Sequence, residues 1–559
     1  MFIGIDVGGT FTDGILLHEG KILSTAKHPT DANNLQSSII SVLDRLIRDR
    51  EARHINRVVL STTLVTNLIA TGKGDQTALV LIPGPGLNVR KMRFFPHTFI
   101  IDGATDFRGR IIKPLNEEQV KEAGEAIAAA GIKKVAVVGK FSPRNSSQEQ
   151  RVQEILLRHH PQLEVITGFQ VSGQLNFLRR AVTTYYTAMT KEKWSLFAEK
   201  MKDALEQRGI NCPVSILKAD GGTMPLSVSL QHPCETVFSG PAASAMGAFA
   251  LTMDEQTSVV VDIGGTTTDL ALILQGRPLY ASKGARIQEH YTSIRSFAVR
   301  SIPIGGDSAV SWNGSRIMIG PHRSGPAACF GGPAATPTDA VNFLAGGNLG
   351  ELELSRQALA QIAQKAGLPV RELAQFIVEQ MVDSLEENIR DMFKSWEQEP
   401  AYKIYEIVHK RRVKLDRAVG IGAAAGAFVP LLAERMQCQS FVHSLSPVAN
   451  ALGAAVSRPT LSLLLHADTQ QKSYYLNLEG ISGQVSRNFQ LADAKELAKK
   501  HLQELARKRG MEAYASQHEF FLEEQFNMIR GWSTMGKLFD VGIQIVPGVI
   551  NEFEGVHDR

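Results

Sequence analysis

Hydrophobic and polar residues follow two periodicities along the chain. Short apolar runs bounded by glycine or polar turns predict strands, and apolar residues three and four positions apart predict amphipathic helices. The expected strands lie at 2–7, 14–17, 21–26, 58–60, 78–82, 134–138 and 214–217. The expected helices lie at 35–47, 117–130, 148–158, 177–208, 239–250, 355–397 and 492–508. Alternation of the two kinds of element predicts an α/β protein with largely covered sheets.

Two further stretches divide the chain. Residues 320–337 are rich in Gly, Pro and Ala, which predicts an irregular loop. Residues 460–472 are expected to be a linker ahead of a smaller α/β unit. We therefore expect three parts: an N-terminal lobe at 1–168, a second lobe at 169–460 and a C-terminal domain at 461–559.

The composition is that of a large globular protein. With 559 residues, the chain exceeds the size of one ordinary core. The formal net charge of +4 argues against a nucleic-acid-binding protein, in which basic residues are in excess. The four cysteines are widely spaced, the N-terminus does not resemble a signal peptide, and no apolar run reaches about 18 residues. These features predict a cytoplasmic protein with no membrane partner.

The strongest feature is an internal duplication. The segment Asp6–Asp13 (DVGGTFTD) recurs as Asp262–Asp269 (DIGGTTTD), with six of eight positions identical at an offset of 256 residues, from 262 − 6. The turn at Glu19-Gly20 recurs as Gln275-Gly276 at the same offset. A repeat of this kind predicts two lobes of one architecture.

Each copy carries groups that bind phosphate. Paired glycines let backbone N–H groups approach an anion, and threonine hydroxyls add further donors. The aspartates that end the first strand of each copy, Asp6 and Asp262, are expected to hold Mg²⁺ directly or through water. Two such turns that face each other across a cleft would form a phosphate clamp. The expected nucleotide-binding residues are Gly8, Gly9, Thr10, Thr12, Gly264, Gly265, Thr266 and Thr268.

The duplicated arrangement resembles the superfamily of actin, hexokinase and Hsp70, whose members close two lobes on ATP. The resemblance implies an α/β fold with two ribonuclease-H-like lobes around an ATP cleft, plus a smaller C-terminal α/β unit. Ile304–Asp307 (IGGD) resembles the Gly-Gly turn that follows the second hairpin, which implies nucleotide contacts from Gly305 and Gly306.

A later glycine-rich segment fits the same superfamily. Val419–Gly426 (VGIGAAAG) resembles the segment that binds adenosine and leads into a helix, which implies contacts from Gly420 and Gly422. Close helix packing through small residues is the alternative.

Seven motifs in order narrow the resemblance to the hydantoinase A/5-oxoprolinase family, over about residues 1–460. They are GIDVGGTFTD at 4–13, STTLVTN at 61–67, DGGTM at 220–224, SGPAA at 239–243, DIGGTTTD at 262–269, GPAACFGG at 325–332 and TDA at 338–340. The resemblance implies that ATP phosphorylates a carbonyl oxygen of an amide, imide or ketone. The phosphorylated oxygen is then a good leaving group for ring opening or carboxylation.

The same resemblance implies roles for individual side chains. Asp6 and Asp262 belong to the ATP clamp, while Asp13 or Asp269 acts as a base or positions water. Asn67 would orient substrate or phosphate, and a capped turn is the alternative for the segment 61–67. We therefore expect an ATP- and Mg²⁺-dependent hydrolase of a cyclic amide or imide.

The chain departs from the family pattern in ways that bear on its substrate and partner. The loop at 320–324 is short, Phe526–Gly531 replaces an Arg-Tyr-x-Gly-Gln-type stretch, and no second, B-type half is present. We expect a small carbonyl substrate and a B-type subunit, a client enzyme or a second copy as partner. The alternative functions are an ATPase subunit of a ketone carboxylase, an ATP-driven reactivase or activator, and a non-catalytic nucleotide-binding subunit.

Several distinctive residues outside these motifs are expected to be structural. We expect Cys329 to be a buried thiol, and the spacing of His290, His322 and His443 is not that of metal ligands. We expect residues 409–414 (HKRRVK) to form a solvated basic face. Asp102, Asp106 and Arg108 are expected to form a charged loop rather than an acid/base site.

Overall fold

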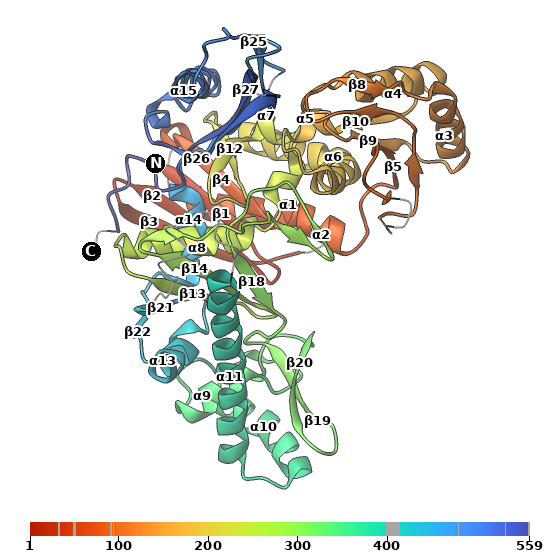
Figure 1. Ribbon diagram of the computed structural model, residues 1–559. Helices are drawn as coiled ribbons and strands as arrows, with labels where there is room; N and C mark the ends of the chain where they lie inside the picture. Colours follow the sequence, from red (N-terminus) through yellow and green to blue (C-terminus); the bar gives the residue numbers. More distant parts are fainter. Residues whose placement is uncertain are drawn as a thin grey trace.

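The computed structural model describes residues 1–556 except 32–33, 49–51, 90–91, 93, 399–413, 479 and 532. Two lobes lie one above the other, and two smaller units stand on the upper lobe (Figure 1). Sheets alternate with helices throughout, so the expected α/β class is confirmed. Residues 409–413 of the basic run lie outside the described residues.

The upper lobe is built on a six-stranded sheet of order β12-β11-β4-β1-β2-β3. Its strands are β1 (Phe2–Val7), β2 (Phe11–His18), β3 (Lys21–Pro29), β4 (Arg57–Thr62), β11 (Val214–Leu217) and β12 (Thr223–Pro225), and α1 (Leu35–Ile47) and α2 (Leu64–Ala70) accompany them. Strands β1, β4 and β11 are parallel, so their carboxyl ends meet at one edge. Because β11 and β12 follow residue 168, this lobe draws on both sides of the expected domain boundary.

A second unit is inserted between β4 and β11, and it stands apart at the upper right in Figure 1. Its main sheet has the order β10-β9-β5-β6, and β7 pairs with β8. The elements are β5 (Thr77–Ile82), β6 (Thr98–Ile100), β7 (Ala104–Thr105), β8 (Ile111–Lys113), α3 (Glu117–Ala129), β9 (Lys134–Gly139), α4 (Ser147–His159), β10 (Glu164–Thr167) and α5 (Gly168–Val171). The long helix α6 (Phe177–Glu206) leads back to the upper lobe.

The lower lobe repeats the topology of the upper one. In its sheet, β13 pairs antiparallel with β14 and parallel with β21, as β1 pairs with β2 and β4. The sheet contains β13 (Ser258–Ile263), β14 (Thr268–Leu274), β15 (Arg277–Pro278), β18 (Val299–Ile302), β21 (Arg417–Ile421) and β22 (Gln439–Phe441). Around it lie β19 (Ser308–Trp312), β20 (Ile317–Arg323), α9 (Pro337–Leu344), α10 (Leu352–Ala366), α11 (Val370–Glu397) and α13 (Ala425–Met436). The short pair of β16 (Arg286–Ile287) and β17 (His290–Tyr291) packs on the upper lobe instead, where Ile287 joins the core and β17 contacts α6.

Two helices of small residues lie between the sheets, α8 (Ser239–Thr252) and α14 (Ala449–Val456) (Figure 1). A methyl group at Gly247 would overlap the carbonyl oxygen of Ala449, and one at Gly453 would overlap that of Ala243. Glycine at both positions therefore allows the two backbones to touch. As a result, α14 brings its first turn to the space between the lobes.

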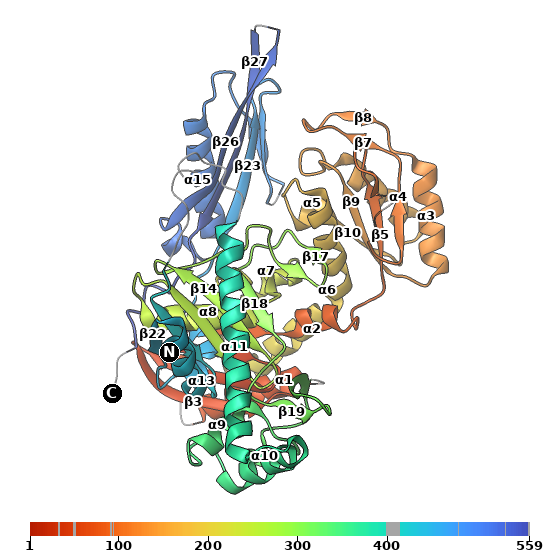
Figure 2. The same ribbon diagram turned by 60° about the horizontal axis from the view of Figure 1, so that its bottom comes forward.

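The C-terminal unit is a five-stranded sheet of order β25-β24-β23-β27-β26. It is formed by β23 (Ser462–Asp468), β24 (Ser473–Leu476), β25 (Ser482–Gln484), β26 (His518–Arg530) and β27 (Ser533–Ile545), with α15 (Leu491–Lys508). The expected linker at 460–472 is wrong, because residues 462–468 form the middle strand of this sheet. Leu463, Leu465 and Ala467 are buried at alternate positions, a period of two that the linker interpretation missed. The β26–β27 hairpin projects beyond the other strands (Figure 2).

Two other expectations need correction. The irregular loop expected at 320–337 begins within β20, which continues to Arg323, and α9 starts at Pro337. The helical region 355–397 is two helices, because Gly367 adopts a left-handed conformation (φ 68°) at the end of α10 and Pro369 precedes α11.

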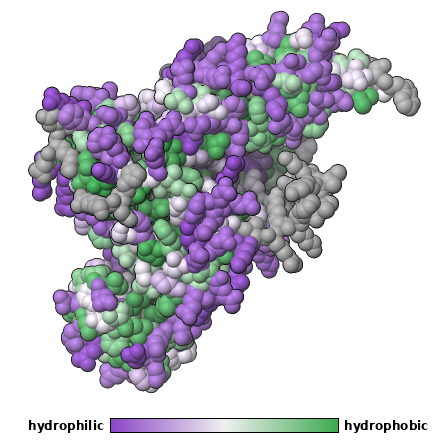
Figure 3. Space-filling view, turned by 90° about the vertical axis from the view of Figure 1, so that its left-hand side faces the viewer, coloured by the Kyte–Doolittle hydropathy of each residue, from purple (hydrophilic) through white to green (hydrophobic). Residues whose placement is uncertain are grey.

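The surface is mostly hydrophilic in the view of Figure 3, with a hydrophobic area on the lower lobe. Exposed apolar side chains of that lobe include Leu431 and Val442. In the part of the chain that the structure describes, no helix is both long and apolar enough to cross a bilayer.

Candidate functional site

The two duplicated turns face each other between the lobes. In both, the N–H of the first glycine, Gly8 or Gly264, donates to the carbonyl three residues later at 3.0 Å. The turns also approach each other, because a Cβ built on Gly265 would lie 3.2 Å from Oγ1 of Thr10. Both turns stay partly or fully exposed at Gly8, Gly9, Thr10, Gly264, Gly265 and Thr266. The duplicated sequence therefore forms two matching turns around one accessible space.

The side chain of the second threonine of each motif points away from the space between the turns. Thr12 and Thr268 are fully buried. The Thr12 hydroxyl is hydrogen-bonded to that of Thr30 at 3.0 Å, and the Thr268 hydroxyl donates to the carbonyl of Ile304 at 2.7 Å. These two hydroxyls therefore stabilise their hairpins and do not face the open space.

Asp6 and Asp262 end β1 and β13 and share one partner. Nδ2 of Asn450, in the first turn of α14, donates to Oδ2 of Asp262 at 3.0 Å and to Oδ2 of Asp6 at 3.4 Å. The Ser244 hydroxyl of α8 donates to the same oxygen of Asp262 at 2.5 Å. Among the described residues, Oδ1 of Asp6 and Oδ1 of Asn450 are buried without a hydrogen-bond partner. Buried polar atoms without partners are rare, so this pair has capacity for a ligand.

All four aspartates of the two motifs have raised pKa values. Burial, and then the charges of Asp13 and Asp262, raise the pKa of Asp6 to about 7. Burial and the charge of Asp262 raise the pKa of Asp269 to about 7. The pKa of Asp13 is raised by burial against the opposing effect of Lys27, whose Nζ donates to Oδ1 of Asp13 at 2.6 Å. Burial also raises the pKa of Asp262. Of these four carboxyls, those of Asp6 and Asp269 therefore exchange protons near neutral pH.

This donor set fits Mg²⁺ bound together with phosphate. Among the described residues, no three His, Cys, Asp or Glu side chains are placed to hold a metal by themselves. Mg²⁺ usually takes one or two carboxylates and completes its shell with water and phosphate oxygens. Asp6 and Asp262 provide two carboxylates, and Oδ1 of Asp6 is unpartnered.

The Gly305-Gly306 turn supports the second glycine turn from behind. The N–H of Gly306 donates to the carbonyl of Gly264 at 2.9 Å, and that of Asp307 donates to Gly265 at 2.8 Å. A Cβ on Gly305 would lie 2.6 Å from both carbonyl oxygens. Gly305 and Gly306 are themselves buried, so they act through the turn that they support.

The two glycines of the adenosine-like segment differ. Gly420 is buried in β21, where a Cβ would contact Ala425, Val429 and Val442 at 3.0 Å, so it fits the helix-packing alternative. Gly422 follows the strand with φ 90°, and a Cβ there would lie 3.2 Å from Oδ1 of Asp262. Only Gly422 of this pair therefore lies beside the carboxylates.

In the segment 61–67, the first residue, Ser61, lies at the site, whereas the last residue, Asn67, does not. The Ser61 side chain lies beside Asp6 and lowers the pKa of its carboxyl, and the Ser61 hydroxyl donates to that of Ser239 of α8 at 3.2 Å. Asn67 is exposed on α2, and its Nδ2 donates to the Thr63 hydroxyl at 3.2 Å. That contact fits the capped-turn alternative for Asn67.

Three residues of the site escaped the sequence reasoning. Ser244 stands one residue beyond the SGPAA motif, and Lys27 pairs with Asp13 in the β2–β3 register, so the hairpin register was an available signal for Lys27. Asn450 is 444 residues from Asp6 in sequence, and only the crossing of α14 and α8 brings it to the aspartates.

The residues expected to be structural lie away from the carboxylates. Cys329 is buried, and burial and the nearby Asp339 raise its pKa to about 12, which keeps the thiol unreactive. In the expected charged loop, Arg108 forms an ion pair with Asp468 of β23 at 3.1 Å. Lys113 and Arg110 pair with Asp102 and Asp106 in the same loop.

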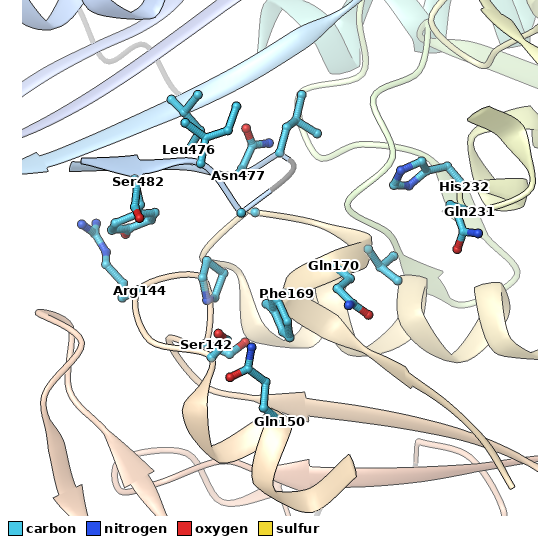
Figure 4. Close-up of a pocket in the computed structure, with 18 of the residues that line it drawn as sticks. Ser142, Arg144, Gln150, Phe169, Gln170, Gln231, His232, Leu476, Asn477 and Ser482 are labelled. Atoms are coloured by element: carbon cyan, nitrogen blue, oxygen red, sulfur yellow. The ribbon is translucent and has the colours of Figure 1, made fainter. Parts of the chain in front are cut away.

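A cavity of 1080 Å³ lies between the inserted unit, Lys191 in the middle of α6, residues 228–232 and the C-terminal unit. Figure 4 shows Arg144 and Ser482 at one end, Gln231 and His232 at the other, and Phe169 and Gln170 between them. None of the residues expected at the nucleotide site lines this cavity, so it is separate from the carboxylates.

Two family models match the chain. Residues 2–160 match the model described as hydantoinase/oxoprolinase N-terminal region, and residues 180–462 match the model described as hydantoinase/oxoprolinase. Together the two matches contain both glycine turns, Asn450 and Ser244.

Curated relatives are similar over most of the chain. An uncharacterized protein of Methanocaldococcus jannaschii is 25% identical over 67% of this chain and 62% of its own length. The caprolactamase subunit alpha of Pseudomonas jessenii is 25% identical over 78% of this chain and 67% of its own length. The acetophenone carboxylase gamma subunit of Aromatoleum aromaticum is 24% identical over 67% and 58%, respectively. The chain thus spans about three fifths to two thirds of these relatives.

Two solved structures share the fold. Nucleotide-free acetone carboxylase superposes with a TM-score of 0.71 at 18% identity, covering 98% of this chain and 87% of that one. ATP-dependent caprolactamase from Pseudomonas jessenii gives 0.70 at 19% identity, covering 97% and 87%. The chain therefore has the fold of these two structures, and the expected α/β architecture with two lobes and a smaller C-terminal unit is confirmed.

Proposed function

Because the chain belongs to the hydantoinase/oxoprolinase family, we propose that it is an ATP-dependent enzyme that phosphorylates the carbonyl oxygen of a cyclic amide or imide and so promotes ring opening. One observation carries the proposal. Two matching glycine turns face each other around the carboxylates of Asp6 and Asp262, which Asn450 joins, and this is the arrangement of a phosphate clamp. The similarity to a caprolactamase subunit supports the amide substrate.

In the proposed reaction, each group of the site has a separate role. Backbone N–H groups of both turns and the hydroxyls of Thr10 and Thr266 would hold the phosphates in line with the carbonyl. Mg²⁺ held by Asp6 and Asp262 would neutralise phosphate charge. Asp269, with a pKa of about 7, would exchange a proton with attacking water near neutral pH. Attack of one water on the activated carbon and breakage of the ring C–N bond would leave an acyl phosphate and the free ring amine, which takes up a proton. A second water would hydrolyse the acyl phosphate to the carboxylate and release phosphate.

The test is ADP release by the purified chain with a panel of hydantoin, 5-oxoproline and caprolactam. At least one compound should stimulate release, and with the partner subunit present the ring-opened product should appear in equal amount. No stimulation by any compound, with or without a B-type partner, would contradict the hydrolase and favour an ATP-driven activator.

A ketone carboxylase ATPase subunit is a second candidate, favoured by the similarity to the acetophenone carboxylase gamma subunit. Acetone and acetophenone with bicarbonate test it in the same assay. Stimulation by a ketone but by no cyclic amide would select this candidate. In either case we propose that a partner subunit completes the reaction, since both named relatives are subunits.

A further inference from the structure

A cavity of 460 Å³ lies where α6, the upper lobe and the C-terminal unit meet, and residues 280–295 close it. It adjoins the larger cavity of Figure 4, with which it shares His232 and Asn477. None of the four aspartates and neither glycine turn lines it, so it is distinct from the proposed nucleotide site. We call it the arginine cavity.

The DGGTM motif at 220–224 forms one wall of the arginine cavity. Two glycines of this motif are in tight contact with other segments. A Cβ on Gly221 would overlap the ring of Phe297, and one on Gly222 would overlap the side chain of Thr460. Glycine at both positions therefore lets these two segments close around Asp220, which lines the cavity.

The two acids of the lining are engaged by the protein itself. Asp220 and Glu235 both face the buried Lys218, whose Nζ lies 3.0 Å from Asp220 and 3.6 Å from Glu235. Asp220 also accepts a hydrogen bond from the Thr460 hydroxyl at 3.1 Å. A buried cation needs such partners, so this cluster serves the fold.

Two arginines of the lining have no such partners. In the part of the chain that the structure describes, neither Arg179 of α6 nor Arg295 forms an ion pair. The Arg295 guanidinium lies over two aromatic rings, 4.1 Å from the ring centre of Tyr280 and 4.8 Å from that of Phe521. Such contacts involve the face of the guanidinium and leave its N–H edge for an acceptor, which carboxylate and phosphate oxygens fit.

Two hydroxyls of the lining also lack partners. Among the described residues, the hydroxyl oxygens of Tyr280 and Ser293 are buried without a hydrogen-bond partner. Ser293 is held against the start of α6, because its N–H donates to the Thr183 hydroxyl at 2.8 Å and Nε2 of Gln174 donates to its carbonyl at 3.0 Å. Buried polar atoms without partners are rare, so two in one cavity indicate a place for a polar ligand.

We propose that the arginine cavity binds a small organic molecule with two oxyanion ends, carboxylates or phosphates. One end meets the N–H edge of Arg295 and the hydroxyl of Tyr280, and the other meets Arg179 and the hydroxyl of Ser293. The cavity has the volume of a small-molecule site. Binding here is independent of the proposed reaction, because the nucleotide-site residues lie outside the lining.

The first test is calorimetric titration of the purified chain with succinate, 3-phosphoglycerate and propionate. Succinate or 3-phosphoglycerate should bind at least about tenfold more tightly than propionate, which has one oxyanion only. The tighter of the two shows whether the second end is a carboxylate or a phosphate. No binding of either, or equal affinity for propionate, would overturn the inference.

Saturating Mg·ATP should leave the affinity for the tighter probe unchanged. Displacement of the probe by Mg·ATP would place it at the nucleotide site and would also overturn the inference.

The second test uses variants of the lining. Tyr280→Phe/Ser293→Ala removes two hydroxyls that make no hydrogen bond in the fold, so urea unfolding should show no loss of stability. The affinity for the tighter probe should nevertheless fall by at least about tenfold, and Arg295→Gln should lower it by a similar factor. The matched control is Arg316→Gln, an exposed arginine outside the lining, which should bind as wild type. Wild-type affinity in the hydroxyl variant or in Arg295→Gln would contradict the proposed site.

Discussion

The aspartates of the two glycine turns place four carboxyl groups close together in a largely desolvated space, where Lys27 contacts Asp13. Such an arrangement is costly for folding, because burial disfavours the charged form and like charges add to the penalty. Asn450 offsets part of this cost by donating to both carboxylates at once. Residues that are costly for the fold and lie at an accessible turn are typical of functional sites.

Replacing Asp262 by Asn tests the carboxylate at this scale. The amide keeps the size of the side chain but removes the charge that would hold Mg²⁺, so ADP release should fall by at least about 100-fold. Steady-state ADP release at saturating Mg·ATP is the measurement. The control is Asp203→Asn, an exposed carboxylate of α6, which should behave as wild type. Activity within about threefold of wild type in Asp262→Asn would rule out a role for this charge.

At the scale of elements, the crossing of α8 and α14 decides where Asn450 and Ser244 meet the aspartates. The crossing depends on Gly247 and Gly453, since a methyl group at either would overlap the other helix. The packing of two short helices thus controls the geometry of a site that neither helix could form alone.

Gly453→Ala should push α14 away from α8. We expect the free energy of unfolding to fall by about 2 kcal/mol or more, because the added methyl group meets backbone that cannot move independently. Urea unfolding measures the change. Gly240→Ala is the matched control on α8, since nothing lies within 4 Å of a Cβ there, and its stability should not fall. Equal stability of both variants would show that the crossing tolerates separation.

The junction between the inserted unit and the C-terminal unit is a second element-scale feature. Arg144 contacts His466 and forms an ion pair with Asp540 at 3.3 Å, and His466 Nδ1 lies 2.6 Å from Asp540 Oδ1. Burial lowers the pKa of His466 below its usual 6.5. Burial alone would raise the pKa of Asp540, but the contacts with His466 and Arg144 lower it overall.

These shifts predict that the junction contributes less to stability in acid. For His466, the unfolded chain binds more protons than the folded one below about pH 6.5, so stability falls as pH falls through that value. The contribution of Asp540 is lost only below its usual range, near pH 4. Urea unfolding of wild type and His466→Gln at about pH 7.5 and 5.5 isolates the histidine, because the opposing effect of Asp6 and Asp269, whose pKa values of about 7 favour the folded chain at the lower pH, is common to both proteins. His466→Gln should show a smaller difference between the two pH values than wild type, and an unchanged difference would contradict this assignment.

At the scale of the whole molecule, the site belongs to neither lobe. Asp6 comes from the upper lobe, Asp262 from the lower, and Asn450 from the helix between them. A nucleotide that binds both turns therefore links the lobes, so its binding should raise the free energy of unfolding of the whole chain.

Mg·ATP should raise the unfolding free energy of the whole chain by about 2.7 kcal/mol at a free concentration 100 times Kd. The thermal midpoint with Mg·ATP, ATP alone and Mg²⁺ alone is the measurement, and the full shift should require both components. Asp262→Asn should lose most of the shift while keeping its midpoint in the absence of nucleotide. A shift of equal size in that variant would place nucleotide binding elsewhere.

The sequence determined the elements and the duplication. Asp6–Asp13 and Asp262–Asp269 repeat at one offset, and the structure repeats the pairing of their strands and the hydrogen bond of each turn. Local patterns sufficed here, because the strand period and the glycine turns depend on neighbours in sequence. The same local reasoning failed at 460–472, where we expected a linker but residues 462–468 form β23 with an apolar face in the core.

Only the tertiary structure decided which groups share the site. In the folded protein, the hydroxyls of Thr12 and Thr268 are buried and Asn67 is exposed on a helix. Gly420 serves the packing of the following helix, and Asn450 contacts both aspartates. These outcomes depend on the crossing of α8 and α14 and on the approach of the two lobes, which are contacts between residues hundreds of positions apart. A repeat shows that two half-sites exist, but their meeting depends on packing that no local pattern records.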